Sequence, residues 1–106
     1  MPKFLIKASY TAEGARGIAK EGGTGRRATV QKLVESLGGK MECFYFGYGD
    51  ADVYVISELP DATSALALSL ATNSSGSVRV STIPLITPEE MDAAAKKSVA
   101  YRAPGA

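Results

Sequence analysis

The 106-residue sequence contains no histidine and no tryptophan, and its only cysteine is Cys43. Without histidine the chain lacks the commonest general base and the commonest metal ligand, which excludes a Ser-His-Asp or Cys-His mechanism within one chain. A lone thiol forms no disulfide within the chain, and this is typical of a reducing compartment. We therefore expect a cytoplasmic protein with no metal and no cofactor.

A strong charge bias and long apolar runs are also missing. The chain has 12 Lys and Arg residues against 11 Asp and Glu residues, without a basic block, so nucleic acid is not an expected partner. No apolar run approaches the ~20 residues of a membrane helix, and no signal-peptide pattern is present. The length suits one domain. We expect it over residues 1–100, with 101–106 as a flexible tail.

The apolar pattern predicts an α+β fold. β-Branched and aromatic residues recurring with period two predict strands over 3–10, 40–46, 52–58 and 78–86. Helical signals lie between and after these strands: a Thr11 cap, a stripe at Val30, Leu33, Val34 and Leu37, a start at Pro60-Asp61, and a Thr87-Pro88-Glu89-Glu90 capping box whose helix should run to about Val99. The order β-α-β-β-α-β with a C-terminal helix is the ferredoxin-like pattern, whose antiparallel sheet carries helices on one face.

The pair Gly49-Asp50 is suited to a two-residue type II′ turn, which would place Phe46 opposite Val53 and Tyr45 opposite Tyr54. Alternation then sorts the side chains into two faces. The face expected under the helices holds Phe4, Ile6, Ala8, Phe44, Phe46, Val53, Val55, Val78 and Val80. The opposite face, here called the open face, holds Leu5, Lys7, Ser9, Met41, Cys43, Tyr45, Tyr54, Ile56, Arg79, Ser81 and Ile83. Because it is rich in apolar and aromatic groups, we expect a second copy to cover it in a homodimer or a higher homo-oligomer.

Several segments resemble the GYD-domain family of small proteins in the dimeric α/β-barrel superfamily. The matching segments, in chain order, are Tyr10-Thr11-Ala12-Glu13-Gly14, Leu37-Gly38-Gly39-Lys40, Tyr45 with Gly49, Asp52 and Val53, Glu58-Leu59-Pro60-Asp61, Gly76-Ser77-Val78-Arg79 and Thr87-Pro88-Glu89-Glu90. The resemblance implies a ferredoxin-like fold and a dimeric α/β barrel, and it implies no activity. The ungapped alignment places Ala51 where the family's Gly-x-Tyr-Asp motif has tyrosine, so no role of that tyrosine transfers.

Each candidate site residue has two interpretations. Asp52 is either a general base or a hairpin residue that binds the turn backbone. Lys7 and Arg79 either clamp a carboxylate or phosphate or pair with a carboxylate across the dimer. Tyr45 and Tyr54 either contact an aromatic ligand or pack across the strands. Cys43 is a small core residue unless a cation such as Arg79 activates its thiol.

The segment Glu21–Arg27 has three glycines before two arginines. It departs from the GxxxxGK[ST] phosphate loop, so we interpret it as a break between two helical pieces, with a lid over the open face as the alternative.

Two functions remain open for the whole chain. It is either a non-catalytic module that binds a small organic, anionic or aromatic, ligand, or a metal- and cofactor-independent enzyme, oxygenase- or isomerase-like, that uses Asp52, Tyr45 and Arg79. No membrane partner is expected.

Overall fold

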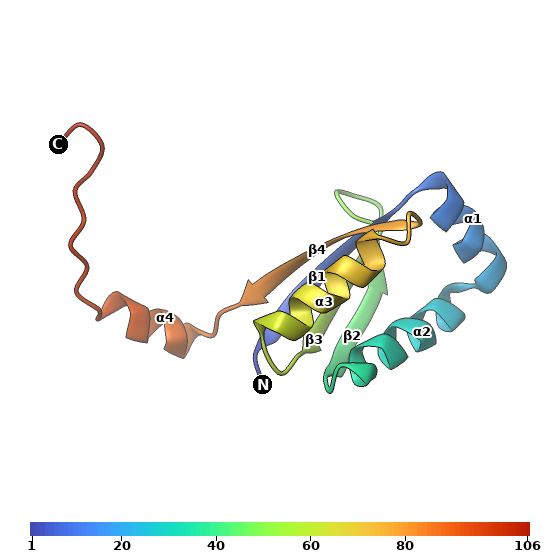
Figure 1. Cartoon of the computed structure of the whole chain (residues 1–106), viewed down its shortest axis with the longest axis horizontal. Helices are drawn as coiled ribbons and strands as arrows, with labels where there is room; N and C mark the ends of the chain where they lie inside the picture. Colours follow the sequence, from blue (N-terminus) through green and yellow to red (C-terminus); the bar gives the residue numbers. More distant parts are fainter.

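The computed structural model describes all 106 residues and forms one sheet with helices on one side (Figure 1). The elements in chain order are β1 (Lys3–Tyr10), α1 (Ala12–Glu21), α2 (Gly23–Ser36), β2 (Lys40–Phe46), β3 (Val53–Glu58), α3 (Ala62–Asn73), β4 (Val78–Leu85) and α4 (Pro88–Ala95). The four predicted strands are confirmed to within one residue at each end. No helix is both long enough and apolar enough to cross a membrane.

The four strands pair antiparallel in the order β2-β3-β1-β4. The predicted hairpin register is confirmed, since Phe46 pairs with Val53 and Tyr45 with Tyr54. Helices α1, α2 and α3 contact β1, β2 and β4 respectively. Helices α2 and α3 lie over the same face of the sheet, while the opposite face carries no helix (Figure 1).

The core lies between the sheet and the helices, as the alternation predicts. Strand β3 shows the pattern most clearly, because Val53, Val55 and Ser57 are buried while the residues between them are partly exposed. The buried cluster is Phe4, Ile6, Ala8, Val34, Val53, Val55, Leu59, Ala65, Leu68 and Val78. The stripe on α2 is confirmed: Val34 is fully buried and its stripe neighbours pack against the cluster.

The turn prediction for the hairpin is wrong although its register is right. Strand β2 ends at Phe46 and strand β3 begins at Val53. The Gly47 N–H donates to the Asp52 carbonyl at 2.9 Å, so the loop between this pair, residues 48–51, is longer than two residues. A type II′ turn needs a positive φ at Gly49, and this residue has none. The loop is held from outside the hairpin instead, because the Asp52 N–H donates to the Ala8 carbonyl at 2.8 Å.

Met41 lies on the helix side rather than on the open face. The β2–β3 register shifts between Met41 and Cys43, so Met41 pairs with the buried Ser57 and packs against the core. A bulge adds one residue to one strand and reverses the alternation beyond it, and this is the physical reason for the error. Phe46 lies on the helix side as expected, against Gly23 at the start of α2, although on the edge strand β2 it is still 45% exposed.

The glycine-rich break is narrower than the sequence predicts. Only Gly22 interrupts the helix, with φ 86°, and α2 already begins at Gly23. Gly25 and Arg26 therefore belong to a helix on the covered side of the sheet, so this segment is not a lid over the open face.

Helix α4 extends away from the rest of the domain. The capping box at Thr87 and Glu90 is confirmed, but the helix ends at Ala95, before the predicted Val99. None of its residues is buried, so no packing supports a longer helix. With this arm the chain has a radius of gyration of 16.8 Å, against about 13 Å for a compact domain of this length.

We predict that Gly14→Ala strongly destabilises the domain, by about 2–4 kcal/mol, as overpacking against rigid backbone does. A Cβ at Gly14 would collide with the Ser77 carbonyl, where the chain after α3 contacts α1. Gly17→Ala in the same helix is the matched control, because a Cβ there meets nothing within 4 Å. It should stabilise the helix by up to about 1 kcal/mol. Urea unfolding measures both, and equal effects of the two variants would contradict this packing.

Candidate functional site

The side chains of the open face are arranged in rows across the sheet. One row consists of Tyr45, Tyr54, Lys7 and Ser81, taken from β2, β3, β1 and β4 in turn. Arg79 lies one row further along, on β4, opposite Ser9 of β1. The register therefore brings three of the four predicted ligand-binding residues into one row and places Arg79 diagonal to Lys7.

Lys7 is the centre of this arrangement. Its Nζ atom lies 6.0 Å from the centroid of the Tyr54 ring, at the outer limit of a cation–π contact. The Tyr54 ring in turn lies under the hairpin loop, because a Cβ at Gly47 would come within 3.1 Å of it. Tyr54 thus fills the space between Lys7 and the loop, as expected of a residue that packs across strands.

Lys7 and Arg79 line one hollow of about 640 Å³ on the open face. Ser9 and Ser81 lie between them, and Asp50 comes from the hairpin loop. Two cations against one carboxylate give the hollow a net positive charge, which favours an anionic group. Tyr45 lies outside this hollow, on the edge strand β2, and is 69% exposed.

Asp52 is bound to the end of β1 rather than to the hollow. Its Oδ2 atom accepts the Tyr10 N–H at 2.9 Å, while its own N–H donates to Ala8. The carboxylate thus binds backbone, but of the central strand and not of the turn. Asp52 does not line the hollow that contains Lys7 and Arg79.

Cys43 is separated from the cations. It lies in an apolar row with Ile56, Leu5 and Ile83, and it is half-buried. Arg79 is on the opposite edge strand, so this residue does not activate the thiol. The position fits the small apolar role. No group of three or more acidic or cysteine side chains gathers to hold a metal ion.

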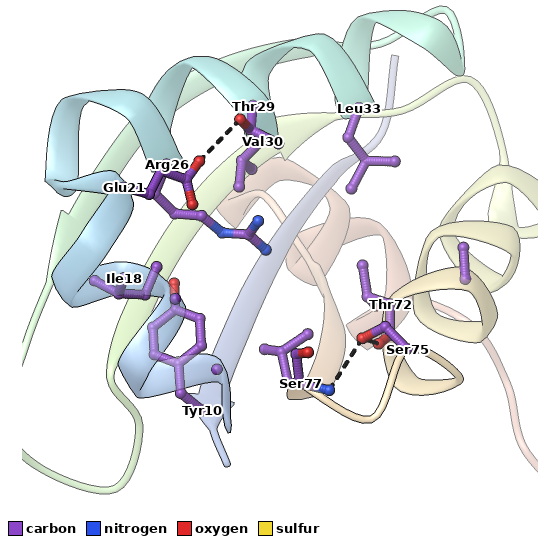
Figure 2. Close-up of a pocket in the computed structure, with 14 residues that line it drawn as sticks. Tyr10, Ile18, Glu21, Arg26, Thr29, Val30, Leu33, Thr72, Ser75 and Ser77 are labelled. Carbon is purple, nitrogen blue, oxygen red and sulfur yellow. Dashed lines mark hydrogen bonds between the residues drawn. The ribbon is translucent and has the colours of Figure 1, made fainter. Parts of the chain in front are cut away.

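A second pocket, which sequence reasoning missed, lies on the helix side between α1, α2 and α3 (Figure 2). It has a volume of about 450 Å³ and opens beside Tyr10, Arg26 and Ser77. Arg26 is on the same face of α2 as Val30 and Leu33, at the i, i+4, i+7 spacing. That spacing is the available signal, but the interpretation of Glu21–Arg27 as a break hides it.

Tyr10 and Arg26 face each other in this pocket (Figure 2). Burial raises the pKa of the Tyr10 phenol above its ordinary value of 10.0, and the Arg26 guanidinium partly opposes this by favouring the phenolate. The phenol is therefore protonated at neutral pH and available as a hydrogen-bond donor.

These features define an α+β domain with a four-stranded antiparallel sheet, one helix-covered face and one open face. The GYD domain family model matches residues 4–95, which is most of the chain, so the chain belongs to the GYD domain family. No curated protein and no solved structure gives a significant match.

The family's motif tyrosine position remains occupied by Ala51, which is 3% exposed, while the nearby Tyr48 is fully exposed in the loop. The side chain at position 51 is thus directed into the protein. Tyr48 does not replace a buried tyrosine there.

We predict that Tyr10 ionises at a higher pH than an ordinary phenol, because burial raises its pKa. Because the pKa of Tyr10 is raised, the folded protein holds the phenolic proton more tightly than the unfolded chain does. The contribution of this proton to the free energy of unfolding is complete below the unfolded pKa of about 10 and is lost as the pH rises through the folded pKa. Absorbance titration near the phenolate band should show a late phase that Tyr10→Phe removes. The control is Tyr48→Phe, which should leave the late phase in place, and identical titrations of the two variants would contradict the burial of Tyr10.

Proposed function

We propose that this protein is a ferredoxin-like, homodimeric α/β-barrel module of the cytoplasm, which binds a small organic anion over the open face. The observation that carries the proposal is the hollow in which Lys7 and Arg79 meet beside an apolar, uncovered sheet surface. The strand order β2-β3-β1-β4, with one helical connection before each of β2 and β4, supports the ferredoxin-like class. The lone Cys43 supports the reducing compartment.

Packing supports a dimer through the open face. Ile83 is 39% exposed there, and the half-buried Leu5 and Ile56 adjoin it in the same row. Contiguous apolar surface of this kind is normally covered by a partner. The second copy is the occupant we propose, because a twofold axis lets one surface cover its own equivalent.

The outer edge of β4 is a poor surface for strand pairing, which favours contact through the face. The Val80 N–H donates to Asn73 Oδ1 at 2.7 Å, and the Val80 carbonyl accepts from Asn73 Nδ2 at 3.3 Å. Further along the same strand, Pro84 has no N–H to donate. Blocked edges of this kind prevent the addition of further strands.

The C-terminal arm also lacks a partner in its own subunit. Met91 of α4 is 61% exposed and Ile86 before it is 59% exposed. A helix of eight residues is marginal in water without packing. A second subunit supplies the surface that the arm needs.

The ligand class follows from the hollow. Arg79 offers a planar pair of donors that matches a carboxylate, and Lys7 adds a point charge with Tyr54 beside it. Tyr45 and Tyr54 of the adjoining row would contact an aromatic portion of the ligand, in part from across the dimer.

The alternative, a metal- and cofactor-independent enzyme, needs Asp52, Tyr45 and Arg79 to act together. Tyr45 and Arg79 lie on opposite edge strands, and the Asp52 carboxylate is engaged by the Tyr10 backbone. The three side chains do not converge within one subunit. We therefore propose ligand binding, rather than catalysis, as the function of this face.

For the dimer we predict that Ile56→Glu gives a monomer, because the substitution places a charge in the proposed interface. The matched control is Ala67→Glu, which adds the same charge at an exposed position on α3 and should leave the dimer intact. Light scattering coupled to size-exclusion chromatography gives the mass of each. A stable wild-type monomer at micromolar concentration would contradict the proposal.

For the ligand we predict that small aromatic acids such as benzoate stabilise the dimer, by about 1.4 kcal/mol at ten times Kd. Arg79→Gln should abolish the part of the stabilisation that comes from acid bound in the open-face hollow, and Lys7→Gln should weaken that part. Arg16→Gln, at an exposed position on α1, is the control and should behave as wild type. Thermal unfolding with and without the acid measures the effect, and an Arg79→Gln protein that is stabilised as much as wild type would exclude the open-face hollow as its source.

A further inference from the structure

We propose that the pocket between α1, α2 and α3 is a separate binding site for a singly charged carboxylate with an apolar body, held by Arg26. This site lies on the helix-covered side of the sheet, opposite the hollow with Lys7 and Arg79. It is formed within one subunit and does not depend on the proposed dimer.

The guanidinium of Arg26 carries the inference, because it faces the Tyr10 phenol but forms no ion pair with any carboxylate. The chain contains two ion pairs, Met1 with Glu58 and Lys3 with Glu42, so no carboxylate lies within 4.0 Å of Arg26. Its Nε atom is buried and makes no hydrogen bond. Figure 2 shows the guanidinium extending into the pocket rather than out to solvent. A partly buried cation with no carboxylate in contact is unfavourable for the free protein.

The surroundings of Arg26 suit the apolar part of a ligand. Ile18, Val30, Leu33 and Val78 line the pocket, and its volume of about 450 Å³ is that of a site for a small organic molecule. A smaller apolar cavity of about 30 Å³ adjoins it toward the sheet, shares Arg26 in its lining, and reaches Val53 and Leu68. A carboxylate at Arg26 would therefore have its hydrocarbon portion directed along apolar walls.

Tyr10 offers a second donor at the same place. Its ring forms one wall of the pocket and its hydroxyl is directed toward Arg26 (Figure 2). A carboxylate can accept from a guanidinium and a phenol at once, since each oxygen has two lone pairs. The phenol and the guanidinium come from β1 and α2, so the two donors are held by separate elements.

Glu21 determines the charge that the site accepts. Its carboxylate lines the pocket and accepts the Thr29 hydroxyl at 3.2 Å, which holds it beside Arg26 without an ion pair (Figure 2). Glu21 is exposed, so water screens its charge more than that of the partly buried Arg26, and the site still favours a single negative charge on the ligand. A phosphate dianion would be repelled by Glu21, so carboxylate is the class we expect.

The probe for this site is phenylacetate, titrated into the full-length protein and followed by amide NMR. We expect shifts at Ile18, Val30 and Ser77. Phenylacetamide lacks the charge, acetate lacks the apolar body and inorganic phosphate carries more charge, so each should bind at least about tenfold more weakly. Binding should persist in Ile56→Glu, because the pocket is complete in one subunit.

Arg26→Met tests the role of the guanidinium, with Arg27→Met at the exposed neighbouring position as the matched control. Arg26→Met should weaken phenylacetate binding by at least about tenfold, whereas Arg27→Met should leave it within about twofold. The ligand-free Arg26→Met protein should melt no lower than wild type, since an unpaired, partly buried charge is removed.

Three results would overturn the proposal: no phenylacetate binding at millimolar concentration, shifts confined to the surroundings of Lys7 and Arg79, or unchanged affinity in Arg26→Met. A clear fall in the melting temperature of ligand-free Arg26→Met would also overturn it, because Arg26 would then serve the fold.

Discussion

The hydrogen bonds that β1 makes on both of its edges are the constraint on which the rest of the structure depends. Strand β1 pairs with β3 through Lys3–Ala8 and with β4 through Lys3–Tyr10. The register of β1 with β3 and β4 therefore decides which side chains of these strands lie on each face of the sheet. A shift of one residue in the pairing would move every side chain of the shifted strand to the other face. Asp52 extends this control beyond the strands by binding the backbone of Ala8 and Tyr10. The hollow on the open face lies where Lys7 and Ser9 of β1 pair with Ser81 and Arg79 of β4.

A single layer of helices leaves this sheet with two different surfaces. Toward the helices, Ile6, Val55 and Leu68 belong to a buried apolar core, in which the hydrophobic effect dominates. On the other side, cations and tyrosines stand among apolar residues that a monomer leaves partly exposed. Because α4 points away from the body, this face of the sheet stays uncovered in the chain. The uncovered face is thus a consequence of topology, and it does not rest on any one residue.

Much of the fold could be predicted from the sequence because its signals are local. The period of two in β1 and β3, the stripe on α2 and the capping box at Thr87 each depend on residues close in the chain. The errors arose where distant contacts decide. The bulge that turned Met41 inward and the bond from Asp52 to Ala8 depend on pairing between strands, which propensity does not encode.

The same limit applied to the two candidate sites. The row that contains Lys7 and Tyr54 follows from the register and was predictable, as was the place of Arg79 near it. The pocket at Arg26 was not, because it depends on how α1, α2 and α3 are placed relative to one another. A single positive φ at Gly22, where three glycines suggested a long break, lets α2 begin early and brings Arg26 over the sheet.

The composition of the pocket wall explains why the space beside Arg26 remains unfilled. Gly14, Gly17, Ala71 and Ser75 line it where larger side chains could close the gap between α1 and α3. Gly14 is required by the close approach of Ser77, but a Cβ at Gly17 would meet nothing within 4 Å. Apolar pocket walls that face water lose the contacts that close packing would give them, and a guanidinium without an ion pair beside them adds a second unfavourable feature. Both are relieved by the same event, the entry of an apolar carboxylate, and this coincidence distinguishes the pocket from a packing defect.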